Sequence, residues 1–143
     1  MKLLIIRHAD PYYSIDSLTP TGWKEAELLS HRISKLDVTA FYTSPLGRAK
    51  DTASLTLQKV NREATVCPWL REFNCTINRP DADKRIIPWD WLPADWTAVP
   101  EHFDRNLWHT TDIMQDGKVK EEYDWVTSEL DKLLASHGYE RNG

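Results

Sequence analysis

The chain has 143 residues, of which 41% are hydrophobic and 28% are charged, as in an ordinary globular domain and unlike a disordered chain. The formal net charge of -4 argues against a nucleic-acid-binding protein, because such proteins usually carry a basic face. No apolar run is long enough to span a bilayer, and Arg7 and His8 interrupt the opening MKLLII where a signal peptide would continue. We therefore expect a cytoplasmic protein that binds neither nucleic acid nor membrane.

The first element is the apolar run of residues 3–6, which predicts a strand buried on both faces. Arg7 and His8 follow it directly. Because open α/β sheets bind ligands at the carboxyl ends of their strands, these two side chains mark a candidate site.

A loop over residues 11–18 leads to the first helix. Apolar residues at helical spacing predict this helix over residues 19–36, with Thr19 as its cap and Pro20 in its first turn. β-branched and aromatic residues then predict a second strand over residues 38–43.

Ser44 and Pro45 repeat the cap-and-proline signature and predict a helix over residues 45–59. A short third strand is expected over residues 65–70, and it ends at Arg71 and Glu72. The apolar face expected of the helix over residues 45–59 consists of Ala49, Ala53 and Leu57.

Residues 74–117 show no sustained period and contain several prolines and tryptophans. So long an irregular insertion in a compact domain is usually functional, and its tryptophans favour packing over disorder, so we interpret it as a lid or side wall. Trp89, Trp91 and Trp96 are expected to pack this lid. An apolar stripe at helical spacing then predicts a helix over residues 118–137.

Alternating strands and helices predict an α/β fold of three layers, α/β/α, with a mostly parallel sheet and right-handed crossovers. One domain over residues 1–143 is expected. In such a sheet the strand ends share one edge, which would bring together Arg7 and His8, the start of the second helix, and Arg71 with Glu72.

These side chains suit phosphoryl transfer. Neutral imidazole is a good nucleophile near pH 7, and His8 could attack phosphorus. Arg7 and Arg48 could hold phosphate oxygens, and Glu72 could protonate the leaving alkoxide, although Arg71 or Asp10 could do the same work. Ser14, in the loop after the first strand, is a further candidate for substrate binding.

Four segments, RHAD, LTPTGWKEA, YTSPLGRAKDTA and WLREF, resemble in order and spacing the histidine phosphatase superfamily, which includes the phosphoglycerate mutases. The resemblance covers about residues 1–75 and the helix at 118–137. It implies a phosphoglycerate mutase-like fold in which His8 takes the phosphoryl group, Arg7 and Arg48 bind it, and Glu72 donates the proton. Ala9 stands where the family commonly has glycine, and both residues are small enough for a close approach to phosphate.

The family also uses a second histidine at the end of a later strand. His137, followed by Gly138, continues the helical stripe, so we interpret it as the end of a helix and not as that partner. We therefore expect the sequence to be a fragment that lacks the C-terminal strands, and to be unstable or to associate along the edge of its first strand.

Three functions stay open on the sequence. The first is a phosphomonoester hydrolase acting through phosphohistidine on His8, and the second is a phosphoglycerate mutase-type phosphotransferase. The third, from another class, is a non-catalytic phosphate-binding or regulatory module. The partner expected is a small phosphorylated substrate, no metal or other cofactor is needed, and a homo-oligomer is left open.

Overall fold

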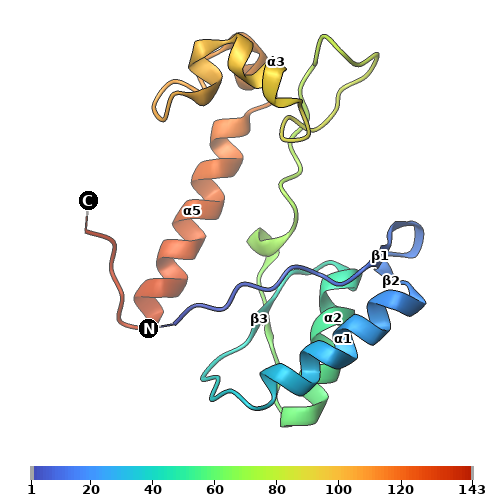
Figure 1. Cartoon of the computed structure of the whole chain (residues 1–143). Helices are drawn as coiled ribbons and strands as arrows, with labels where there is room; N and C mark the ends of the chain where they lie inside the picture. Colours follow the sequence, from blue (N-terminus) through green and yellow to red (C-terminus); the bar gives the residue numbers. More distant parts are fainter. Residues whose placement is uncertain (1, 143) are drawn as a thin grey trace. The chain divides into compact units, whose positions relative to one another are not determined.

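The computed structural model describes residues 2–142, which form two compact units divided between Arg71 and Glu72 (Figure 1). Each unit is described by itself below. Helices and short strands alternate in the first unit, whereas the named elements of the second unit are all helices, joined by long irregular segments. None of the helices in the described residues is both long and apolar enough to cross a membrane.

The first unit opens with a small hairpin where a loop was expected. Strand β1 (Pro11–Tyr12) pairs antiparallel with β2 (Ser17–Leu18), and the 3-10 helix η1 (Tyr13–Ile15) connects them. Asp16 closes this turn in the left-handed conformation, with φ 47°. An aspartate tolerates this conformation better than most residues, which explains its place at the turn.

Helix α1 (Pro20–Ile33) begins where the sequence predicts. The Thr19 hydroxyl oxygen accepts a hydrogen bond from the Gly22 amide at 3.1 Å, so the predicted cap is confirmed. The helix ends at Ile33, three residues earlier than expected. Its buried face contains Ala26, Ser30 and Ile33 and packs against α2.

Strand β3 (Tyr42–Thr43), helix α2 (Gly47–Val60) and strand β4 (Thr65–Val66) form the predicted crossover. The two strands pair in parallel, with Tyr42 opposite Thr65. Both strands are shorter than predicted, because Pro68 starts the 3-10 helix η2 (Pro68–Leu70) and ends the third strand early.

Helix α2 corrects two expectations. It begins at Gly47, two residues after Pro45. Its most buried side chains are also not the predicted apolar stripe: the buried positions are Arg48, Thr52 and Thr56. Polar side chains can occupy this face because the Arg48 guanidinium is paired with a carboxylate and the Thr52 hydroxyl donates to the Arg48 carbonyl at 2.7 Å.

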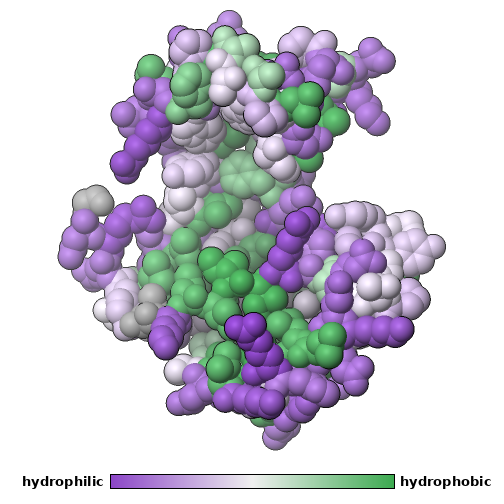
Figure 2. Space-filling model, in the orientation of Figure 1, coloured by the Kyte–Doolittle hydropathy of each residue, from purple (hydrophilic) through white to green (hydrophobic). Residues whose placement is uncertain are grey.

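The first predicted strand is not formed. Residues 3–6 belong to no strand of the described chain, and their side chains are between 44% and 85% exposed. A strand needs a hydrogen-bonded neighbour and cover on its faces, and within residues 2–142 β3 pairs only with β4. The predicted three-layer arrangement with a mostly parallel sheet is accordingly not seen in the described residues. Apolar side chains are visible at the surface in Figure 2.

The second unit contains the segment predicted to be irregular. It forms α3 (Pro93–Ala98), the 3-10 helix η3 (Pro100–Phe103) and α4 (Asp112–Asp116), and a single bridge joins Ile77 to Ile86. Its core consists of Ile77, Trp91, Met114 and Val119, with Trp96 and Trp108 packed against it. The packing expected of Trp91 and Trp96 is confirmed, and the Trp89 ring contacts the Phe73 ring edge to face.

Helix α5 (Val119–Ser136) matches the predicted helix within one residue at each end. His137 is its C-cap, and Gly138 follows with φ +80°, a conformation that suits glycine. The Gly138 amide donates to the Ala135 carbonyl at 2.9 Å, and the Tyr139 amide donates to the Leu134 carbonyl at 3.1 Å. The interpretation of His137 as the end of a helix is confirmed.

Candidate phosphate site

Arg48, in the first turn of α2, is held by Asp16 of the hairpin. Its Nη1 donates to Asp16 Oδ1 at 2.8 Å, and only 10% of its side chain is exposed. Asp16 also accepts from two backbone amides, that of Gly47 at 2.6 Å (Oδ2) and that of Arg48 at 3.4 Å (Oδ1). The Gly47 amide is the largest cause of a lowered pKa of the Asp16 carboxyl, and Arg48 lowers that pKa further against an opposing effect of burial.

The start of α2 explains why the chain folds this way. Leu46, the residue before the helix, has no side-chain oxygen to accept the first amides, and Asp16 accepts them from 31 residues away in sequence. The approach is close: a Cβ on Gly47 would lie 2.1 Å from the Asp16 carbonyl oxygen. Glycine at this position is therefore what lets the hairpin lie on the helix.

Tyr13 lies beside two of the predicted site residues of this unit, His8 and Arg48. The Arg48 guanidinium carbon is 5.3 Å from the centre of the Tyr13 ring, a cation–π contact. The His8 and Tyr13 rings meet edge to face with their centres 6.4 Å apart. The structure thus brings His8 and Arg48 to the same aromatic side chain.

The half-buried His8 ring has a defined hydrogen bond. Its Nδ1 lies 2.9 Å from the Ala9 carbonyl oxygen, which can only accept, so the proton belongs on Nδ1. In the neutral ring Nε2 then carries the lone pair. His8 consequently has the tautomer that a nucleophile attacking through Nε2 requires.

The residues after His8 anchor it to both helices of the unit. The Ala9 amide donates to Thr52 Oγ1 at 3.0 Å, which ties the segment to α2. The Asp10 amide donates to Glu25 Oε2 at 2.8 Å, and the Asp10 carbonyl accepts from the Thr19 amide at 3.1 Å, which ties it to the start of α1. His8 is therefore positioned by the backbone on its C-terminal side.

The remaining predicted residues lie at exposed positions. Arg7 and Ser14 are exposed, Ser14 within η1. Glu72 is exposed at the first position of the second unit, and its role stays a prediction. The Asp10 carboxylate accepts a short hydrogen bond from the Thr19 hydroxyl at the start of α1, so this alternative acid is engaged in a structural contact.

Tyr13, Asp16 and Thr52 were missed on the sequence. A threonine on an amphipathic helix and an aspartate in a short loop are common surface residues, so their types alone carry little signal. The available signal was Gly47 directly before Arg48: a glycine at the start of a helix can indicate a close approach by another part of the chain.

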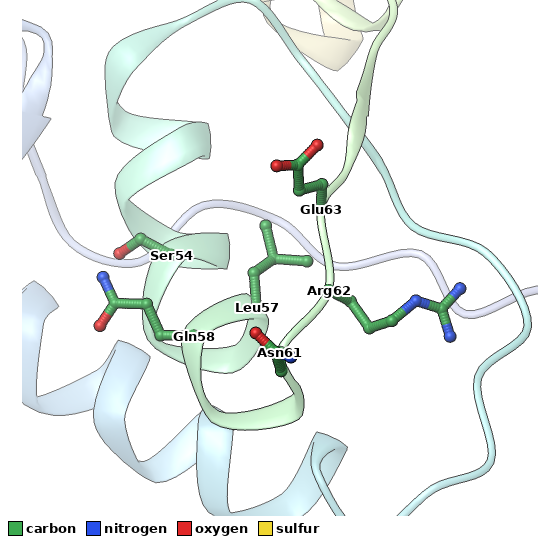
Figure 3. A pocket seen from close by; sticks show the side chains of 6 residues that line it. All are labelled: Ser54, Leu57, Gln58, Asn61, Arg62 and Glu63. Carbon is green, nitrogen blue, oxygen red and sulfur yellow. The ribbon is translucent and has the colours of Figure 1, made fainter.

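The pocket at the C-terminal end of α2 is separate from this candidate site. A pocket of about 620 Å³ lies at the C-terminal end of α2, one helix length from Arg48, and contains none of the predicted site residues (Figure 3). Within residues 2–142 no three His, Cys, Asp or Glu side chains are grouped so that they could hold a metal ion. The pocket is lined by Ser54, Leu57, Gln58, Asn61, Arg62 and Glu63.

Comparison with known proteins agrees with these observations. The sequence profile of the histidine phosphatase superfamily (branch 1) matches residues 3–104, a span that includes every predicted site residue. No curated protein matches the chain. The fold of this superfamily is α/β, which confirms the predicted class, and the match supports a phosphatase- or phosphotransferase-type activity. The chain belongs to the histidine phosphatase superfamily, branch 1.

Proposed function

We propose that the chain is a phosphomonoester hydrolase that works through a phosphohistidine on His8. The single observation that carries the proposal is the hydrogen bond between His8 Nδ1 and the Ala9 carbonyl, which leaves the lone pair on Nε2. Arg48 adds a fixed positive charge at the same aromatic side chain, Tyr13. A nucleophile beside a guanidinium suits an electrophile that carries negative charge, such as a phosphoryl group.

The reaction has two steps. His8 Nε2 attacks phosphorus, the P–N bond forms, and the P–O bond to the leaving group breaks. Arg7 and Arg48 bind the phosphoryl oxygens and balance their charge, with Ser14 as a further ligand. Glu72 gives its proton to the departing alkoxide, and it then takes a proton from the water that breaks the P–N bond and releases phosphate.

The proposal extends to the fold. Residues 1–143 form one histidine phosphatase-like domain of three layers, with a mostly parallel sheet as in the phosphoglycerate mutases. The parallel pairing of β3 with β4 across α2 supports this arrangement, because it is the repeating unit of such a sheet.

Hydrolysis of an aryl phosphate tests the proposed reaction. The unaltered chain should release the aryl alcohol, and His8→Ala should lose at least about a thousandfold in kcat, because the covalent step has no substitute. His31→Ala, on the exposed face of α1, is the matched control and should keep the activity.

Two outcomes would favour the other functions. Activity that requires an added bisphosphoglycerate would indicate a mutase-type phosphotransferase instead of a hydrolase. Binding of inorganic phosphate without turnover by the unaltered chain would indicate a non-catalytic module.

A further inference from the structure

We propose that Asp16 is a positioning residue of the phosphate site, whose carboxylate fixes the Arg48 guanidinium against the start of α2 before a phosphoryl group binds. The inference rests on the proposed function, in which Arg48 is a phosphate ligand. It assigns a role to a residue that lies outside the sequence-predicted set.

The contacts of Asp16 determine where Arg48 can point. Its two carboxylate oxygens accept from the Gly47 amide, the Arg48 amide and Arg48 Nη1, so the backbone and the side chain of Arg48 are fixed by one group. The Tyr13 ring lies against the guanidinium as a second restraint. A guanidinium restrained in this way loses less conformational freedom when it binds an anion, and preorganisation of this kind strengthens binding.

A carboxylate at this position could instead compete with phosphate for Arg48, and the backbone argues against that alternative. The Asp16 amide donates to the Tyr13 carbonyl at 3.3 Å, and the Asp16 carbonyl oxygen lies against Gly47, where a Cβ would be only 2.1 Å away. The hairpin β1–β2 holds this turn on both sides. Asp16 is thus part of the turn's packing on α2 and not a loose anion in a phosphate seat.

The experiment measures binding of inorganic phosphate to the full chain by titration calorimetry, which does not require turnover. Asp16→Ala should weaken phosphate binding roughly tenfold, because charge-assisted hydrogen bonds that fix Arg48 are lost. The phosphate affinity of Asp16→Asn should lie between those of the unaltered chain and Asp16→Ala, since the asparagine amide oxygen can still accept from a backbone amide at the start of α2. Asp37→Ala removes an exposed carboxylate from the same unit and should leave binding unchanged.

A double-mutant cycle separates positioning from general support of the fold. In an Arg48→Gln background, Asp16→Ala should have little further effect on phosphate binding, because its target is gone. A full and independent effect in that background would show that Asp16 acts elsewhere and would overturn the inference. Thermal melts followed by circular dichroism establish whether each variant is folded. If Asp16→Ala is not folded, Asp16→Asn replaces it in the cycle.

The other results are also decisive. Unchanged or tighter phosphate binding in Asp16→Ala overturns the inference. Tighter binding would mean that the Asp16 carboxylate competes with phosphate for Arg48. Absence of phosphate binding by the unaltered chain overturns it as well. Phosphate binding that depends on Asp16 and Arg48 without any turnover leaves the inference standing and refutes the proposed hydrolase.

Discussion

Two threonines on the same face of α2 offer a matched pair of substitutions. Thr52 and Thr56 are each 4% exposed, one turn apart. The Thr52 hydroxyl accepts from the Ala9 amide at 3.0 Å and donates to the Arg48 carbonyl at 2.7 Å. The Thr56 hydroxyl oxygen is buried without a hydrogen-bond partner in the described chain. Replacing either residue by valine keeps the β-branched shape of the side chain and exchanges its hydroxyl for a methyl group.

The two changes should therefore have different effects on the free energy of unfolding. Thr52→Val leaves the half-buried Ala9 amide without its acceptor and should cost about 1–3 kcal/mol. Thr56→Val removes a buried hydroxyl that makes no bond, and it should be neutral or stabilising by about 1 kcal/mol. Because Ala9 follows His8, Thr52→Val should also lower turnover of an aryl phosphate, whereas Thr56→Val should not.

Equilibrium unfolding in urea, followed by far-ultraviolet circular dichroism, measures both variants against the unaltered chain. A shift in the midpoint without a change in the slope reports stability alone. Amide exchange at Ala9 then locates the effect, since its protection should fall in Thr52→Val only. Equal midpoints for the two variants, or a larger loss in Thr56→Val, would refute the assignment of the Ala9–Thr52 hydrogen bond as the support of His8.

Three further predictions concern Gly47, Tyr13 and His102. Gly47→Ala should lower the free energy of unfolding, measured in urea, by about 1–3 kcal/mol, because the new Cβ would meet the Asp16 carbonyl oxygen. Helix propensity alone predicts a stabilising effect, so a neutral or stabilising result would contradict the close approach of Asp16 to Gly47. Tyr13→Phe should keep the affinity for phosphate, whereas Tyr13→Ala should weaken it about three- to fivefold because the cation–π contact with Arg48 is lost. Equal phosphate affinities of the two variants in calorimetry would show that this contact does not support binding. Burial lowers the pKa of His102 below its ordinary value of 6.5, so this imidazole takes up a proton in the unfolded chain before it does so in the folded chain. The free energy of unfolding should therefore fall as the pH drops below 6.5, and His102→Phe should flatten that part of the stability profile. An unchanged profile would refute the assignment of this pH dependence to His102.

Local signals in the sequence predicted the elements that are governed by local interactions. Thr19 with Pro20 predicted the start of α1, and Gly138 predicted the end of α5, because caps and left-handed glycines act within a few residues. The crossover through α2 was also predictable, since alternation of strand and helix constrains the pairing of β3 with β4.

Interactions between distant segments were not predictable in the same way. Asp16 takes the place of a local cap at Gly47 across 31 residues, and no spacing rule signals such a contact. The predicted face of α2, which begins at Ala49, lies one position after the face that is buried, which contains Arg48 and Thr52. The prediction selected hydrophobic residues, whereas hydrogen bonds allow polar side chains to be buried there.

The candidate site shows the same division. His8 and Arg48 could be named from the sequence because the motifs around them are specific, and the structure brings both to Tyr13. What holds them could not be named: the tautomer of His8 depends on a backbone carbonyl, and the orientation of Arg48 depends on a carboxylate in the preceding turn. The apolar run of residues 3–6 shows the opposite case, a strong local pattern that does not become a strand where no neighbour pairs with it.

Trapping the phosphoenzyme tests the central claim most directly. The full chain, mixed rapidly with an excess of labelled phosphate ester and quenched in alkali, should carry one phosphoryl group that is stable to base and lost in acid, as expected of phosphohistidine. The label should be absent from His8→Ala and retained in His31→Ala. A label that survives acid, or one that persists in His8→Ala, would contradict His8 as the nucleophile, and turnover without any trapped label in the unaltered chain would contradict the covalent mechanism.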